Sequence, residues 1–138
     1  MVRSLLPSQA RRYSGEVVKL VFCLHRRSDI DEDDFHRYWT EVHGPLAVSL
    51  APVLGIRRYV QLHTITGRVN DALASGRGAP EHFDGIAELW FDSLDSLFAA
   101  ASSAEGAAAA ETLRIDEARF IDHSRSPIFV GEEQAVLG

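Results

Sequence analysis

Two strand–helix–strand segments of similar length, residues 17–65 and 83–130, constrain the fold of this chain more than any other feature. In each segment, runs rich in β-branched and aromatic residues flank stretches with helical apolar spacing. Right-handed crossovers in both segments bring the strands into one antiparallel sheet and leave the helices on one of its faces. The sequence therefore predicts an α+β, ferredoxin-like βαββαβ fold. The expected strands are residues 16–27, 57–65, 83–92 and 126–131, and the expected helices end near residues 43, 54, 101 and 121.

Polar residues mark the expected helix starts. Asp31 can cap the first helix, and the carboxylates that follow it complement the helix dipole. Ser93 is expected to cap the helix of residues 94–101, and Ser102 with Glu105 forms a capping-box pattern before the last helix. Residues 66–82 contain three glycines and one proline with little periodicity, so we predict a long connection that acts as a lid or binding loop.

The first predicted strand is apolar on both faces. Leu20 and Phe22 share one face, whereas Val21 and Cys23 share the other. The predicted helices cover only one face of the sheet, so the other face needs a second cover. A second copy of the same sheet is the simplest one, and we therefore predict a two-fold homodimer through the sheet face.

The predicted helix that ends near His43 carries an apolar stripe of Phe35, Trp39, Val42 and Leu46, with Tyr38 beside it. His43 lies about 70° from the centre of that stripe at about 100° per residue. Gly44 and Pro45 follow and are expected to interrupt the helix. His43 is therefore either a structural histidine at the border of the core or a titratable group at the rim of a pocket.

Two later strands carry polar side chains. Tyr59, Gln61 and His63 alternate along one face of the second strand, where they line a pocket or face solvent. Glu88 lies on the same face of the third strand as Trp90. A carboxylate in such an apolar strand requires a partner, and burial raises its pKa.

The composition sets broad limits. A chain of 138 residues is expected to form one domain over residues 16–138, after a flexible N-terminal extension of residues 1–15. The net charge of −6 argues against a nucleic-acid partner. The single cysteine, Cys23, forms no internal disulfide, and we expect it to be a buried apolar side chain. With no run long enough for a membrane span or a secretory signal, we expect a cytoplasmic protein with no membrane partner.

Several motifs resemble the EthD family. They are YWTEVHGPL at residues 38–46, APVLGIRRYVQ at 51–61, DGIAELWFDS at 84–93, DEARFID at 116–122 and SPIFV at 126–130. The resemblance implies a dimeric α+β barrel with one pocket in each subunit, and it aligns His43 with the histidine of the family motif. Some members of the family look like dehydratases or cyclisation helpers for polyketide-derived aromatic compounds, and related families include cofactor-free oxygenases.

These observations together lead to a functional hypothesis: a cofactor-independent lyase or isomerase that acts on an oxygenated, polyketide-type or aromatic small molecule. His43 is the expected base, Tyr59 the donor to an enolate oxygen, and Glu88 the acid or the residue that orients the imidazole. The expected substrate-binding residues are Tyr38, Trp39, Gln61, His63 and Trp90.

Other hypotheses stay open. No metal or other cofactor is expected, since a metal set of His43, His63 and Glu88 has no local spacing signature. The alternatives to a lyase are a cofactor-free monooxygenase of the same superfamily and a module that binds a small molecule without chemistry.

Overall fold

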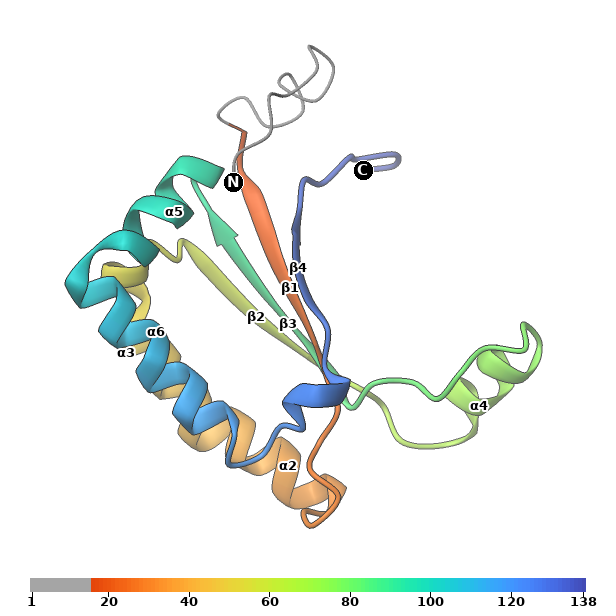
Figure 1. Cartoon of the computed structure of the whole chain (residues 1–138). Coiled ribbons are helices and arrows are strands. Elements are labelled where there is room, and N and C mark those ends of the chain that lie inside the picture. The colour runs from red at the N-terminus through yellow and green to blue at the C-terminus, as the bar shows by residue number, and fades with distance from the viewer. Residues whose placement is uncertain (1–15) are drawn as a thin grey trace.

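Four antiparallel strands form one sheet in the order β2-β3-β1-β4. The computed structural model describes residues 16–138, so the expected extension of residues 1–15 lies outside the described residues. The helices α2, α3, α5 and α6 cover one face of the sheet (Figure 1). This is the predicted ferredoxin-like arrangement, which is confirmed. The strands are β1 (Val18–Leu24), β2 (Arg58–His63), β3 (Gly85–Phe91) and β4 (Ile128–Gly131).

The strand register decides which side chains share a face. Phe22 of β1 is paired with Ala87 of β3 and with Ile128 of β4, and these side chains point toward the helices. Lys19 is paired with Trp90 on the opposite, outer face. Because successive side chains of a strand alternate, Glu88 also lies on the outer face.

The helices follow the strands in the expected order. Asp31 caps α2 and Ser93 caps α5, as predicted, because each side chain accepts a hydrogen bond from a backbone N–H of the first turn. The last long helix begins at Ala104, three residues before the expected start at residue 107, and its cap is Ser103 rather than Ser102. The helices are α2 (Glu32–Tyr38), a π-helical turn (Trp39–His43), α3 (Gly44–Leu54), α5 (Leu94–Ser102), α6 (Ala104–Glu117) and a 3₁₀ turn (His123–Arg125).

The expected interruption at Gly44 and Pro45 is wrong, because α2 continues into α3 through the π-helical turn. The N–H of Gly44 bonds to the carbonyl of Trp39, five residues earlier, and Pro45 has no N–H with which to continue the ordinary ladder. The extra residue in this turn moves the buried stripe. His43 is therefore only 6% exposed, whereas Val42, which was expected within the stripe, is 47% exposed.

The core lies where this helix crosses the sheet. Phe35, Trp39 and Phe120 are buried together with Leu24. Trp39 packs against Gly85 so closely that a Cβ built there would overlap its ring. The core thus fixes the position of the π-helical turn relative to β3.

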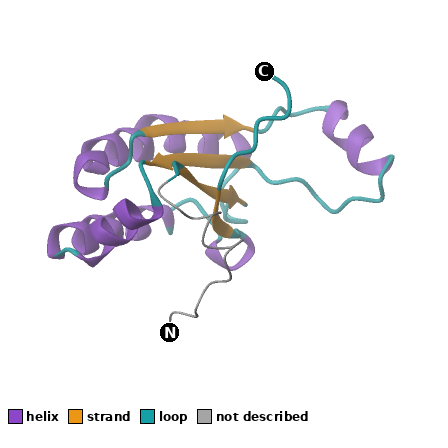
Figure 2. Cartoon of the chain, turned by 90° about the horizontal axis from the view of Figure 1, so that it is seen from above, coloured by secondary structure: helices purple, strands orange, loops and turns teal. Residues whose placement is uncertain are grey.

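Residues 66–82 are not the irregular connection that we expected, since they contain α4 (Arg68–Ser75). This helix projects from the body as an arm, on the side of the sheet away from the other helices (Figures 1 and 2). None of its residues is buried. Within residues 16–138, no helix is long and apolar enough to cross a membrane.

Candidate functional site

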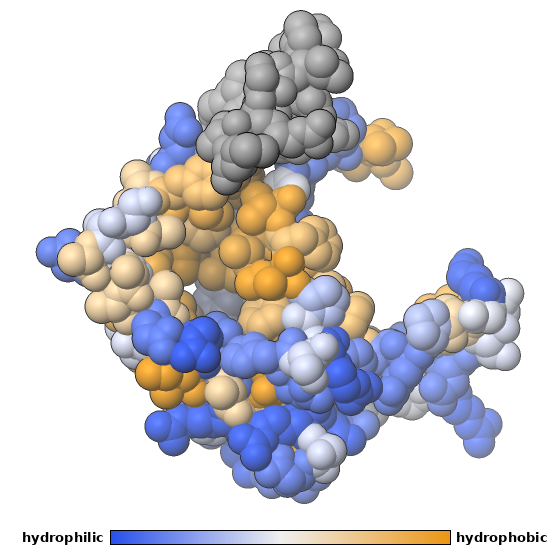
Figure 3. Space-filling model, in the orientation of Figure 1, coloured by the Kyte–Doolittle hydropathy of each residue, from blue (hydrophilic) through white to orange (hydrophobic). Residues whose placement is uncertain are grey.

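An apolar cavity lies between the sheet and the helices. Its volume is about 200 Å³, and its walls include Leu89 of β3 and Leu113 of α6. Figure 3 shows hydrophobic residues gathered in this hollowed region. A smaller chamber of about 40 Å³ shares Phe22, Leu89, Leu113 and Glu117 with it. The chamber brings His43, Tyr59 and Glu117 to the inner end of the apolar cavity.

His43 forms a buried pair with Asp116 of α6, with 2.8 Å between Nδ1 and Oδ2. Tyr38 donates to the other carboxylate oxygen, Oδ1, at 2.6 Å. Because Nδ1–H donates to Asp116, the neutral imidazole keeps its Nε2 lone pair free to accept a proton. Burial, together with the hydrogen bond to Asp116, raises the pKa of Tyr38 to about 12, so this phenol stays protonated. The arrangement fixes the orientation of the His43 ring and leaves Nε2 able to accept a proton.

Glu117 lines both the cavity and the chamber, and among residues 16–138 it is the only acidic residue in either wall. Its side chain is 19% exposed and its Oε1 lies 3.1 Å from Nε2 of His123. Burial raises the pKa of this carboxyl, although the hydrogen bond from His123 and the charge of His43 oppose the shift. A carboxyl of this kind can supply a proton to a bound molecule.

Sequence reasoning missed both Asp116 and Glu117. The two residues belong to the DEARFID motif, which was used only for the family resemblance. They are adjacent in the last turn of α6, so that Asp116 faces His43 and Glu117 lines the cavity. Two consecutive acids before the buried Phe120 and Ile121 were the available signal.

Tyr59, Gln61 and His63 lie on the helix-facing side of the sheet, as His43 does. Gln61 Nε2 donates to the Tyr59 hydroxyl oxygen at 2.8 Å and to the carbonyl of Trp39 at 2.9 Å. Burial raises the pKa of Tyr59, although the hydrogen bonds from Gln61 and Trp39 oppose the shift. The polar stripe of β2 therefore supports the π-helical turn and also brings a phenol to the chamber.

Trp39 and Tyr38 have structural roles near this site. Trp39 is 1% exposed, and its ring packs on His63 with centroids 4.4 Å apart. It lines the chamber as part of the core. Tyr38 bonds to Asp116 and does not line the cavity or the chamber.

Glu88 and Trp90 are separated from His43 by the sheet, so the expectation that Glu88 orients the imidazole or acts with it is corrected. Glu88 binds Lys19 on the outer face at 2.9 Å. Trp90 lies beneath Lys19 and Arg58, and its indole N–H donates to Glu133 at 2.7 Å. Successive side chains of β3 point to opposite faces of the sheet. Leu89 therefore lines the cavity, whereas Glu88 and Trp90 lie on the outer face. Because Glu88 lies on the opposite face of the sheet, it cannot bind one metal ion together with His43 and His63.

A sequence model described as the EthD domain matches residues 27–124. The chain belongs to the EthD family. The family match includes the π-helical turn, Asp116 and Glu117, and thus the whole polar end of the cavity. A curated relative of this EthD protein is "Decarboxylase nsrE" of Aspergillus novofumigatus, 28% identical over 58 residues. That alignment covers 42% of this chain, and the chain spans only 38% of the length of the relative.

Solved structures share the fold of this EthD protein at low identity. An EthD family protein of Bacillus halodurans has a TM-score of 0.58 and 20% identity, over 86% of this chain and 99% of that one. A dimeric ferredoxin-like protein of Bacteroides fragilis has a TM-score of 0.54 and 16% identity, over 88% and 99%. SnoaB of Streptomyces nogalater, a cofactor-independent oxygenase, has a TM-score of 0.53 and 14% identity, over 88% and 97%. These likenesses support the fold and no specific reaction.

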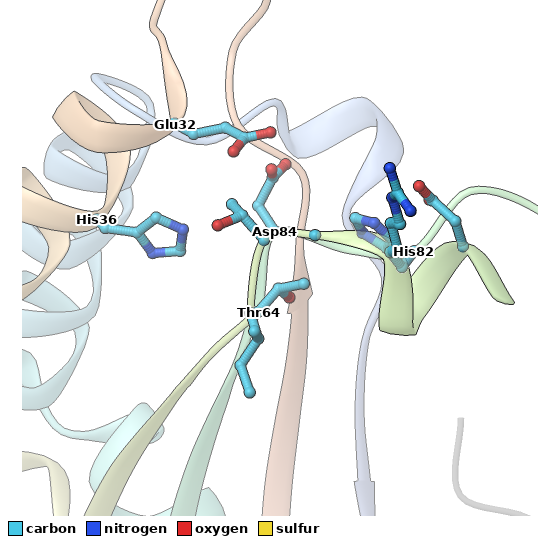
Figure 4. Close-up of a pocket in the computed structure, with 10 residues that line it drawn as sticks. Glu32, His36, Thr64, His82 and Asp84 are labelled. Atoms are coloured by element: carbon cyan, nitrogen blue, oxygen red, sulfur yellow. The ribbon is translucent and has the colours of Figure 1, made fainter. Parts of the chain in front are cut away.

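The EthD domain has a second, polar hollow at the base of the arm, with a volume of about 330 Å³. Glu32 and His36 of α2 point into it, opposite Thr64 and Asp84 (Figure 4). Among residues 16–138, no group of three or more histidine, cysteine or acidic side chains is arranged to hold a metal ion. This hollow lacks the apolar walls of the cavity, so the cavity is the better site for an aromatic ligand.

Proposed function

We propose that this EthD protein is a cofactor-independent lyase or isomerase that acts on an oxygenated, polyketide-type or aromatic small molecule. The observation that carries the proposal is the chamber itself, in which an oriented imidazole, a phenol and a partly buried carboxyl meet at the inner end of an apolar cavity. The name of the curated relative, a decarboxylase, agrees with a lyase. Apolar walls accept the ring of the substrate, and the three polar groups face its oxygenated edge.

The three groups divide the chemistry of an enolate-forming reaction. His43 removes the proton next to a carbonyl group through its free Nε2, and Asp116 stabilises the imidazolium that forms. Tyr59 donates a hydrogen bond to the oxygen that becomes negative. Glu117 protonates the departing hydroxyl group in an elimination, or the carbanion that remains after loss of carbon dioxide.

Substitution of His43 tests this proposal. Wild type and His43→Gln are compared on a panel of hydroxylated aromatic ketones and β-keto acids, with the exposed His82→Gln as the matched control. We expect His43→Gln to lower the turnover rate by about 10²- to 10⁴-fold, the usual contribution of a general base. Equal rates in wild type and His43→Gln contradict the assigned role.

A cofactor-free monooxygenase is the second candidate, and the fold shared with SnoaB favours it. The same cavity then holds an anthrone-like substrate as its anion. An oxygen electrode distinguishes the two, because the monooxygenase consumes one O₂ for each turnover and the lyase consumes none. A module that only binds its ligand retains full affinity in His43→Gln and has no turnover in wild type.

We also propose that two copies of this chain pair through their outer sheet faces. Leu62 of β2 and Phe129 of β4 are more than half exposed on that face. A related fold is described as dimeric in the protein of Bacteroides fragilis. Pairing through this face leaves both cavities open, since each lies on the helix side of its own sheet.

A further inference from the structure

A continuous hydrogen-bonded chain connects the polar hollow to the catalytic chamber. It starts at His36 of α2, whose Nδ1 lies 2.7 Å from Nδ1 of His63. Nε2 of His63 lies 2.8 Å from Oε1 of Gln61. Gln61 in turn donates to the Tyr59 hydroxyl at 2.8 Å. The first residue lines the hollow and the last lines the chamber.

The carbonyl of Trp39 determines the orientation of the Gln61 amide, and with it the direction of the bonds to Tyr59 and His63. The oxygen of Trp39 only accepts, so the Gln61 atom 2.9 Å from it is the amide nitrogen. The Oε1 atom of Gln61 must then accept from His63 Nε2–H. A neutral His63 with its proton on Nε2 has a bare Nδ1, which accepts from His36 Nδ1–H. Burial and the nearby His36 lower the pKa of His63, which favours this neutral form.

The consequence concerns the proton of Tyr59. Its oxygen already accepts from Gln61, so its hydroxyl hydrogen has no acceptor in the chain and is directed elsewhere. The phenol lines the chamber together with His43 and Glu117. A donor fixed in advance in an apolar site stabilises negative charge better than one that must reorient.

We propose that Gln61, held by His63 and His36, is a positioning residue that fixes Tyr59 as the hydrogen-bond donor to an anionic oxygen of an aromatic or enolic ligand. This inference rests on the proposed function only in taking the apolar cavity as the ligand site. It extends that function by naming the residues that orient the Tyr59 hydroxyl before a ligand binds. Gln61, His63 and His36 thereby act through Tyr59 and touch no ligand.

A double-mutant cycle tests the proposal with 4-nitrophenolate as the probe, at a pH where the probe is anionic. The affinity of the probe is measured by its absorbance change in wild type, Tyr59→Phe, Gln61→Glu and the double variant. In wild type, Tyr59→Phe should weaken binding by about ten- to a hundredfold, as expected for a hydrogen bond to a charged group. In the Gln61→Glu protein the new carboxylate accepts the phenolic hydrogen, so Tyr59→Phe should have little effect there.

Repulsion between the new carboxylate and the probe cancels in the comparison, because the effect of Tyr59→Phe is measured between two proteins that both contain Gln61→Glu. The proposal is overturned if Tyr59→Phe weakens binding equally in the two backgrounds. It is also overturned if wild type binds the neutral 4-nitroanisole as tightly as 4-nitrophenolate. These are binding measurements, so they stand even if no turnover is found and the proposed reaction is wrong.

Two further variants guard against misfolding and indirect effects. Gln61→Met is uncharged and similar in length, and it should reduce the effect of Tyr59→Phe several-fold because the phenol is no longer oriented. Thr40→Val is the matched control, since the Thr40 hydroxyl lies 3.3 Å from His63 Nε2 but outside the chain. Thr40→Val should leave the affinity for the probe unchanged, and an effect as large as that of Gln61→Met contradicts the assigned chain.

Discussion

Glu117 has a proposed role as a proton donor, and its burial carries a cost in stability. Its pKa is raised in the folded protein, so its contribution to stability is present below the unfolded pKa and is lost as the pH rises through the folded pKa. We therefore expect Glu117→Gln to raise the melting temperature by a few degrees at pH 8 and by less at pH 4, while turnover falls. Thermal unfolding at the two pH values measures this. A variant that is less stable than wild type at pH 8 contradicts the expected burial cost.

In the proposed reaction, Asp116 acts through the imidazole to which it is hydrogen-bonded. Asp116→Asn preserves the shape but offers an amide that no longer stabilises the imidazolium, and it permits the other tautomer of His43. We expect the turnover number to fall by about ten- to a hundredfold with a smaller change in KM. Tyr38→Phe is the comparison, because it removes one hydrogen bond to Asp116 and leaves the pair with His43 in place. If both variants reduce turnover equally, orientation of the imidazole is not the role of Asp116.

The role of an individual residue was predictable from the sequence where it depends on the residue type and its nearest neighbours in the chain. Asp31 and Ser93 were recognisable as caps, and Cys23 is buried as expected. The contact between His43 and Asp116 was not predictable, because the two residues are 73 positions apart and the pair of acids at 116 and 117 does not show which residue either one meets. Glu88 was predicted as a site residue because it is a carboxylate in an apolar strand. In the structure it forms an ion pair with Lys19 of the adjacent strand β1 on the outer face.

Among the secondary-structure elements, the π-helical turn of Trp39–His43 decides where His43 points. A helix of constant period brings Val42 into the apolar stripe and leaves His43 at its border. The π-helical turn adds one residue, and His43 then faces the core beside Phe120, with ring centroids 5.1 Å apart. Pro45 was visible in the sequence, but the Trp39 carbonyl that accepts from the Gly44 N–H also accepts from Gln61 Nε2. That bond forms between two elements and leaves no local pattern.

The packing of this turn against β3 depends on Gly85. A Cβ at Gly85 meets the Trp39 ring and also lies 2.8 Å from the Leu62 carbonyl oxygen, so the ring must move. We expect Gly85→Ala to reduce the free energy of unfolding by about 1–3 kcal/mol, the usual cost of overpacking. Gly131→Ala in β4 is the control, since a Cβ there has no atom within 4 Å. Chemical denaturation of both variants measures the difference, and equal stabilities contradict the close packing.

The fold of the molecule was predictable because it follows from patterns that extend over whole elements. Alternation in the strands and helical spacing between them were enough to predict a four-stranded antiparallel sheet with helices on one face. The arm was not predictable, because α4 has only eight residues and none of them is buried. Its sequence therefore lacks the apolar density by which a helix of the core is recognised.

The proposed pairing of two copies predicts a specific response to charge on the outer sheet face. Phe129→Asp and Leu62→Asp introduce a carboxylate where the two sheets are expected to meet, and an unpaired charge in an apolar interface is strongly unfavourable. We expect each variant to shift the protein from dimer to monomer at micromolar concentration, as measured by light scattering. Val48→Asp on α3 is the control, because this apolar side chain is also mostly exposed, at 62%, but lies on the helix side. A dimer that survives both outer-face substitutions and dissociates in Val48→Asp places the interface on the helices.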